Sequence, residues 1–225
     1  MAEHQLEVHD DVDSVLRRGS ELMAERANSA IEERGGAALA VSGGSGPWPM
    51  FSRLEDFGLD WTRIGIFQVD ERVAPAGSDE RNLTHLIESL SIGAQGSVKP
   101  MPVTDEDLEA AAGRYAEMLP ERLDLAHLGM GPDGHTASLV PDDPVLEVAD
   151  RSVAVTGNEY QGVRRMTLTY PELAKIRTLV WVVTGENKRE AVAKLLAQDP
   201  SIPAGRVEPA GESIVLVDRA AAPDG

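Results

Sequence analysis

The chain has 225 residues, no cysteine, 42% hydrophobic residues and a formal net charge of −17 at pH 7. A chain of this length buries enough apolar surface for a full core, so it needs no disulfide or metal to fold. The absence of cysteine excludes a disulfide framework, a cysteine-ligated metal and a thiol nucleophile. The negative charge argues against nucleic acid as a partner, because the phosphate backbone is bound by basic surfaces.

The start of the chain, residues 1–11, is polar and acidic. It lacks the basic and apolar regions of a secretion signal, and no later stretch reaches the ~20 apolar residues of a membrane span. We therefore expect a cytoplasmic protein without a membrane partner. We also expect a monomer that acts on a small molecule. If that ligand is an anion, the few cations of this acidic chain must be concentrated at its site.

Residues 12–34 carry apolar side chains at helical spacing and are followed by Gly35 and Gly36, which predicts a long amphipathic helix with a defined end. Similar patterns predict further helices at 48–57, 82–92, 105–118, 171–176 and 186–198. Short apolar runs predict strands at 37–41, 64–69, 123–128, 153–155, 166–169, 178–184 and 213–217. Apolar strands that alternate with helices indicate an α/β fold with a mainly parallel sheet covered by helices on both faces.

The chain contains no internal repeat, low-complexity segment or linker. We therefore expect a single domain over residues 1–225, with a frayed tail at 220–225 and loops at 70–81, 93–102 and 199–208. In parallel sheets, ligands bind at the carboxyl ends of the strands. Unusual residues follow four predicted strands there, in the segments 42–47, 70–73, 129–138 and 185–188.

The first of these segments, Ser42-Gly43-Gly44-Ser45-Gly46-Pro47, connects a predicted strand to a predicted helix. Glycines allow backbone N–H groups to approach a phosphate, and a helix N-terminus favours negative charge. A tight strand-to-helix turn explains the glycines equally well. The loop is neither a P-loop, because no Gly-Lys-Ser/Thr follows, nor a nucleophile elbow, because Pro47 stands where the last glycine is required.

Gly129, Gly131 and Gly134 match the dinucleotide pattern G-x-G-x-x-G, but the context argues against a dinucleotide. Pro141 and other prolines nearby prevent the long helix that such a turn must open. The segment does contain His135, together with Asp133, Thr136 and Ser138. Histidine is suited to proton transfer near neutral pH, so His135 is a candidate general base.

Asp70-Glu71-Arg72 follows a strand directly, and side-chain alternation points Asp70 and Arg72 to one side and Glu71 to the other. A solvated turn with a local ion pair is the alternative interpretation. Arg165 and Lys188 also stand where their cations can reach an anionic ligand, although surface roles are equally compatible with each of them. No histidine pair or carboxylate cluster has metal-ligand spacing, so we expect no metal.

Together these motifs resemble the 6-phosphogluconolactonase family, which is related to the glucosamine-6-phosphate deaminases. The resemblance extends over nearly the whole chain in the order of the family. It is strongest in the string LGMGPDGHTASL at 128–139. The other matching strings are SGGSGP at 42–47, DERVAP at 70–75 with Asn82 after it, RMTLT at 165–169 and TGENK at 184–188.

The resemblance implies a Rossmann-like α/β domain that hydrolyses 6-phospho-D-glucono-1,5-lactone to 6-phosphogluconate in the oxidative pentose phosphate pathway, without a cofactor. His135 would act as general base on the attacking water, while Asp70 and Arg72 would orient the substrate and stabilise charge. The phosphate would lie against the loop formed by Ser42, Gly43, Gly44 and Ser45. Its counter-cations would be Arg165 and Lys188.

The chain departs from the family at Gly46, where threonine is common, and at Arg81, where serine is usual. Arg81 would either alter its loop or add a cation to the site. The related deaminases differ more, with an aromatic residue in place of Arg72 and Asn-Glu-Pro after the histidine loop, where this chain has residues 139–142. A hexosamine-phosphate isomerase or deaminase and a sugar-phosphate sensor without turnover are the alternative functions.

Overall fold

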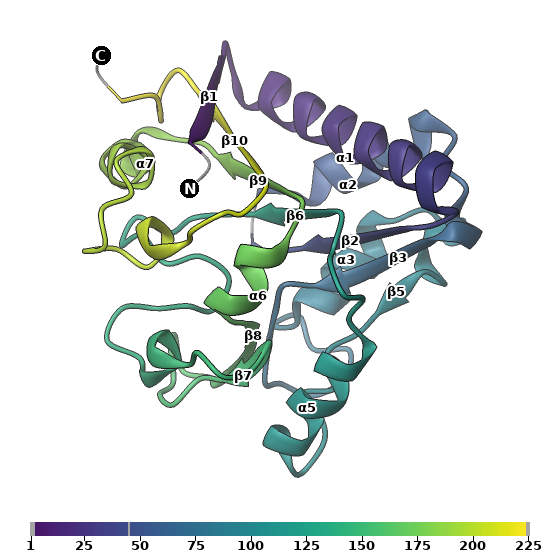
Figure 1. Ribbon diagram of the computed structural model, residues 1–225, viewed down its shortest axis with the longest axis vertical. Coiled ribbons are helices and arrows are strands. Elements are labelled where there is room, and N and C mark those ends of the chain that lie inside the picture. The colour runs from purple at the N-terminus through teal and green to yellow at the C-terminus, as the bar shows by residue number, and fades with distance from the viewer. Residues whose placement is uncertain (1–2, 45, 224–225) are drawn as a thin grey trace.

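The computed structural model describes residues 3–44 and 46–223 of the chain. Within them, seven strands form a sheet in which every pair of neighbours is parallel (Figure 1). This confirms the predicted α/β class. In spatial order the strands are β1 (His4–His9), β10 (Glu212–Asp218), β9 (Thr178–Val183), β6 (Leu125–Leu128), β2 (Ala37–Val41), β3 (Ile64–Gln68) and β5 (Val98–Lys99).

A smaller antiparallel sheet lies beside the carboxyl-terminal end of β3. It consists of β4 (Asp70–Arg72), β8 (Arg165–Leu168) and β7 (Val153–Val155) in that order. The prediction of a loop over 70–81 is therefore wrong for its first three residues, because β4 pairs with a strand far along the chain. In this register Arg72 stands directly opposite Arg165.

Helices pack on both faces of the parallel sheet, as predicted (Figure 1). One face is covered by α1 (Val12–Arg34), α2 (Trp48–Ser52), α3 (Asn82–Ser89) and α4 (Ile92–Gln95). The other is covered by α5 (Leu108–Met118), α6 (Tyr170–Lys175), α7 (Arg189–Leu196) and the smaller sheet. Short 3-10 helices lie at Arg53–Phe57, Trp61–Arg63, Pro144–Glu147, Glu186–Lys188 and Ala204–Arg206.

Alternating side chains of each strand supply the two cores. In β2, Leu39 and Val41 pack under α1, while Ala40 between them packs on the opposite face. Because both faces are buried, the strand reads as a continuous apolar run rather than an alternating one. The helix α1 begins at Asp11, whose carboxylate accepts from the N–H of Ser14 at 2.8 Å, and ends at Gly35 with φ of 82°.

Several predicted boundaries need correction. The strand β1 was not predicted, since it lies partly exposed at the sheet edge and has only two apolar residues, Leu6 and Val8. The helix predicted at 105–118 begins at Leu108, because Asp107 caps it. The frayed tail predicted at 220–225 is wrong up to Ala221, which is fully buried and donates its N–H to Asp218. Residues 224–225 of that prediction lie outside the described residues.

None of the described helices combines the length and the apolar character required to cross a membrane.

The order of the strands defines where a ligand can bind. From β2 the chain proceeds outward through β3 to β5, and from β6 it proceeds in the opposite direction through β9 to β10. The crevice outside the carboxyl ends of β2 and β6 is therefore the switch point at which open α/β sheets bind ligands. The segments that follow these two strands begin at Ser42 and Gly129.

Candidate active site

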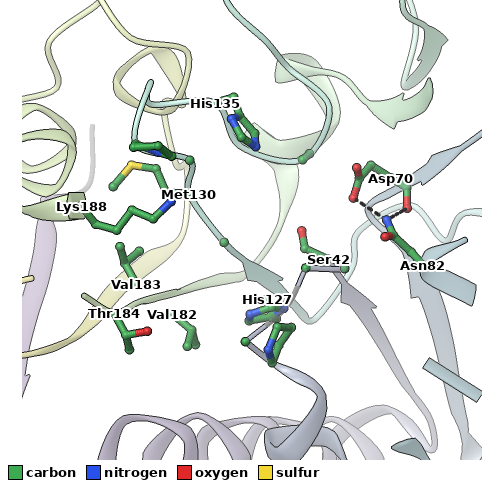
Figure 2. Close-up of a pocket in the computed structure, with 18 of the residues that line it drawn as sticks. Ser42, Asp70, Asn82, His127, Met130, His135, Val182, Val183, Thr184 and Lys188 are labelled. Atoms are coloured by element: carbon green, nitrogen blue, oxygen red, sulfur yellow. Dashed lines mark hydrogen bonds between the residues drawn. The ribbon is translucent and has the colours of Figure 1, made fainter. Parts of the chain in front are cut away.

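A pocket of about 380 Å³ lies at this switch point, a size typical of small-molecule sites (Figure 2). In Figure 2, Lys188 and Asp70 lie on opposite sides of the pocket, with His135 and Ser42 between them. Ser45, a predicted phosphate contact, lies outside the described residues. Every other predicted site residue lines this one pocket, namely Ser42, Gly43, Gly44, Asp70, Arg72, His135, Arg165 and Lys188.

The glycine loop brings polar groups to the floor of the pocket. Ser42 is buried and its Oγ has no hydrogen-bond partner within the described part of the chain. Gly43 packs so closely on Asn82 that a Cβ at position 43 would lie 2.1 Å from the amide oxygen of Asn82. Only glycine fits there, and the contact fixes the loop against α3.

Asp70 is 4% exposed and is held from two sides. Its Oδ2 accepts from the hydroxyl of Ser138 at 2.6 Å, and the side-chain amide of Asn82 donates to its backbone oxygen at 3.1 Å (Figure 2). Burial raises the pKa of Asp70, although Ser138 and the charge of Arg165 act in the opposite direction. Asp70 thus presents a rigidly held carboxyl group to the pocket.

Glu71 points away from the pocket and is fully buried, as the alternation along β4 predicts. It accepts from the backbone N–H groups of Asn82 and Leu83, at 2.8 and 2.9 Å, and thereby caps α3. Arg81 is also buried and pairs with Glu71 at 3.1 Å. Arg81 does not line the pocket, so this departure from the family adds a buried ion pair rather than a cation at the site.

Two guanidinium groups line the pocket from neighbouring strands, Arg72 from β4 and Arg165 from β8. Arg165 is 5% exposed, and its Nε has no hydrogen-bond partner among residues 3–44 and 46–223. Burial lowers the pKa of Arg165, and the charge of Arg72 acts in the same direction while that of Asp70 opposes it. Two like charges on opposed residues repel each other, so an anion between them would stabilise both.

Lys188 supplies a third cation from the turn after β9. Burial lowers its pKa, and the carboxylate of Asp133 acts against that shift. Among the described residues, the electrostatic partner of its ammonium group is Asp133, which does not form a hydrogen bond with it. The three predicted cations therefore converge on one cavity of an otherwise acidic chain, which matches the expectation of a local positive site.

The imidazole of His135 is oriented by a carboxylate. Its Nδ1 lies 2.6 Å from Oδ1 of Asp133, and Nε2 is left for a ligand. Burial raises the pKa of Asp133, but the hydrogen bonds and charge of His135 outweigh burial, so its pKa lies below the ordinary value. The ionised carboxylate of Asp133 favours a proton on Nδ1, and in the neutral imidazole this tautomer has its lone pair on Nε2. This is the arrangement of a general base with an orienting group.

Gly131 allows this pair to form. A Cβ at position 131 would lie 2.1 Å from Nδ1 of His135 and 2.4 Å from Oδ1 of Asp133. We expect Gly131→Ala to displace the imidazole and to lower kcat about 10²-fold, the scale reported for misplaced catalytic groups. Gly113→Ala, on α5 with open space around it, is the control. Steady-state kinetics of both variants tests this, and equal turnover in the two would contradict it.

Sequence reasoning missed part of the site. Asp133 was noted beside His135 without a role. The signal in the sequence was its position two residues before His135, which lets the carboxylate reach the imidazole. Asn82 was noted only within the resemblance. Tyr160 and Gln161 were not identified, since they reach the site from a hairpin with no recognisable motif. His127 also lines the pocket, and burial lowers its pKa to about 3, which keeps it neutral.

The loop after β6 lacks the long helix that a dinucleotide-binding glycine turn opens. The next helix after Gly134 is the 3-10 helix Pro144–Glu147, so no long helix opens at these glycines, as predicted. Among the described residues, no three histidine, aspartate or glutamate side chains gather in a group that could hold a metal ion. The chemistry available in the pocket is therefore that of His135, Asp70, hydroxyl groups and three cations.

Known proteins share both the sequence and the fold. A 6-phosphogluconolactonase of Nostoc sp. is 34% identical over 233 residues, covering 96% of each chain. A crystal structure of a 6-phosphogluconolactonase from Shewanella baltica aligns with a TM-score of 0.87 and 25% identity, covering 96% of this chain and 98% of that one. One from Thermotoga maritima aligns with a TM-score of 0.85 and 27% identity, covering 96% and 100%.

A family model extends this agreement to the motifs. The model described as glucosamine-6-phosphate isomerases/6-phosphogluconolactonase matches residues 10–216, a range that contains all of the pocket-lining residues. The chain therefore belongs to the glucosamine-6-phosphate isomerase/6-phosphogluconolactonase family.

Proposed function

We propose that the protein hydrolyses 6-phospho-D-glucono-1,5-lactone to 6-phospho-D-gluconate. The observation that carries the proposal is one pocket that combines an oriented histidine with three partly desolvated cations. A lactone phosphate needs both, a base for the attacking water and positive charge for the phosphate. The relatives named 6-phosphogluconolactonase, which match nearly the whole chain, support the same activity.

In the proposed mechanism His135 acts as general base. Its Nε2 takes a proton from water as the oxygen attacks C1 of the lactone, and Asp133 stabilises the imidazolium that forms. The tetrahedral intermediate then collapses, and the bond between C1 and the ring oxygen breaks. The imidazolium returns its proton to that ring oxygen, which becomes a hydroxyl group, and the new carboxylic acid ionises in water.

The remaining groups of the pocket bind and orient the substrate. The phosphate lies against the loop of Ser42, Gly43 and Gly44, whose backbone and unpartnered hydroxyl offer donors. Arg165 and Lys188 neutralise its charge. Asp70 orients the sugar ring, and Arg72 stabilises the negative charge that develops during attack. Anchoring the phosphate positions C1 without chemistry at the phosphate itself.

Loss of either counter-cation should weaken binding more than turnover. A hydrogen bond to a charged group contributes about 1.5–3 kcal/mol, so we expect Arg165→Ala and Lys188→Ala each to raise KM about 10- to 100-fold with a smaller change in kcat. Lys194→Ala, on the exposed face of α7 beside Glu190, is the control and should leave KM unchanged. Unchanged KM in both pocket variants would contradict this location of the phosphate.

The decisive experiment is a direct assay with freshly generated lactone, corrected for its spontaneous hydrolysis. We expect enzymatic hydrolysis to exceed ammonia release from glucosamine 6-phosphate. The opposite ratio would establish a deaminase instead. Calorimetric binding of 6-phosphogluconate without lactone turnover would establish a sugar-phosphate sensor.

A further inference from the structure

Tyr160 lies at the tip of the hairpin that joins β7 to β8. Its N–H donates to the backbone oxygen of Val163 at 3.0 Å. The two residues between them, Gln161 and Gly162, have φ of 55° and 84°. Positive φ at both central residues is the pattern of a type I′ turn, which matches the twist of a hairpin. The tip is therefore a defined structure that fixes the position of the Tyr160 ring.

The side chain of Tyr160 contacts both the Asp133–His135 pair and Arg165. Its hydroxyl donates to Oδ2 of Asp133 at 3.0 Å and lies 3.3 Å from Nδ1 of His135. The ring packs edge-on against the imidazole, with 5.2 Å between centroids. Its face lies under the guanidinium of Arg165, 5.1 Å from the ring centroid. One residue thus connects the histidine–carboxylate pair to the cation opposite Arg72.

We propose that Tyr160 is a positioning residue that holds the Asp133–His135 pair in its productive tautomer and fixes Arg165 beside it. The proposal rests on the proposed function for its kinetic consequences. The role of the hydroxyl follows from the two oxygens of Asp133, because Oδ1 accepts from His135 and Oδ2 accepts from Tyr160. With both oxygens occupied, the carboxylate cannot rotate away from the imidazole.

The same contacts select the tautomer. Burial, the hydrogen bond to Asp133 and the charge of that carboxylate raise the pKa of Tyr160, so the phenol keeps its proton. If Nδ1 of His135 had no proton, it would compete with Asp133 for the phenol, and the close approach of Nδ1 to the carboxylate would be repulsive. The hydrogen bond from the phenol to Asp133 therefore favours the tautomer with the proton on Nδ1, in which Nε2 is free to act as base.

The aromatic ring has a separate role. A guanidinium over a tyrosine face gains a cation–π attraction, which is stronger where water is excluded. Arg165 is buried and also donates to Oε1 of Gln161 at 3.0 Å and to the backbone oxygen of Tyr160 at 3.4 Å, so the hairpin tip holds it by three contacts. The hydroxyl and the ring of Tyr160 therefore act on different kinetic constants, the hydroxyl on kcat and the ring on KM.

Two substitutions separate these roles. Tyr160→Phe removes a hydrogen bond to a charged group, so we expect kcat to fall about tenfold and KM to stay within about twofold of the parent. Tyr160→Leu should lower kcat equally and also raise KM about fivefold, because the ring under Arg165 is lost. Tyr170→Phe is the matched control, since Tyr170 also donates its hydroxyl, to Pro203, and lies 5.1 Å below an arginine, Arg206.

A spectroscopic readout tests the tautomer without substrate. In the protein labelled with ¹⁵N-histidine, His135→Ala identifies the His135 signals. In its neutral imidazole the parent should show a protonated Nδ1 and an unprotonated Nε2, and Tyr160→Phe should show a mixture of the two tautomers. The titratable groups that face His135 are Asp133, Tyr160 and Asp70, while Lys188 faces Asp133 and Arg165 lies over the Tyr160 ring.

The outcomes distinguish the inference from the proposed function. An unchanged kcat and an unchanged tautomer in Tyr160→Phe would overturn the role of Tyr160. An equal loss of kcat in Tyr170→Phe would also overturn it, because the effect would then be general. A parent protein without lactone hydrolysis would contradict the proposed function, while the nitrogen shifts of His135 would still decide whether Tyr160 sets the tautomer.

Discussion

Replacing His135 with alanine is expected to lower kcat by at least ~10²-fold, the usual contribution of a general base. The imidazole lines the pocket, and Asp133 holds its Nδ1, so Nε2 is the nitrogen available to accept a proton. Without it the attacking water keeps its proton and the ring oxygen loses its proton donor. The measurement is the steady-state rate of hydrolysis at a saturating concentration of the lactone, so that a raised KM cannot be mistaken for a lower kcat.

The control is His85→Ala on α3, since His85 packs on Trp48 outside the pocket and should leave kcat unchanged. In the parent protein, activity should fall as the pH is lowered, because a protonated imidazole cannot accept a proton from water. The His135→Ala variant should lose that acid limb. Near-normal turnover in His135→Ala, or an acid limb that persists in it, would assign the base to another group.

The sequence was sufficient for elements whose signal is local. The helix at Val12–Arg34 has a continuous apolar stripe, an aspartate cap and a glycine end, and all three are visible in consecutive residues. Elements that exist only through distant partners were not predictable. The edge strand β1 pairs with β10 at the other end of the chain, and β4 is polar and pairs with β8. β4 has no apolar residue and β1 has only Leu6 and Val8, so neither contains the apolar run that predicted the other strands.

The site follows the same rule. His135 and the glycine loop could be chosen from the sequence because each forms a local motif after a strand. The placement of Lys188 in one cavity with them depends on the sheet order, which brings the ends of β2, β6 and β9 together, and that of Arg165 depends on the pairing of β8 with β4. The position of Tyr160 in the site depends on the shape of a hairpin, so its role is identified only by its contacts in the structure.

Glu71→Ala is expected to have the largest effect on stability, a loss of about 3–5 kcal/mol in the free energy of unfolding, the usual result of breaking a buried ion pair. Glu71 is fully buried, and its removal leaves Arg81 as an unpaired buried charge. It also removes the acceptor of two N–H groups at the start of α3. Urea unfolding of both proteins measures the difference, provided that the slope m is unchanged.

A double variant separates the charge from the lost cap. In Glu71→Ala/Arg81→Met the unpaired charge is absent, so the double variant should be more stable than Glu71→Ala alone, with a positive coupling between the two sites. It should still be less stable than the parent, because the N–H groups of Asn82 and Leu83 remain without their acceptor. A loss below about 1 kcal/mol in Glu71→Ala would mean that water replaces the carboxylate, as in surface ion pairs. We also expect the loss of this acceptor to displace the start of α3 in both variants. Since Asn82 contacts both Gly43 and Asp70, that displacement should lower kcat/KM in both, which would link the buried pair to the geometry of the pocket.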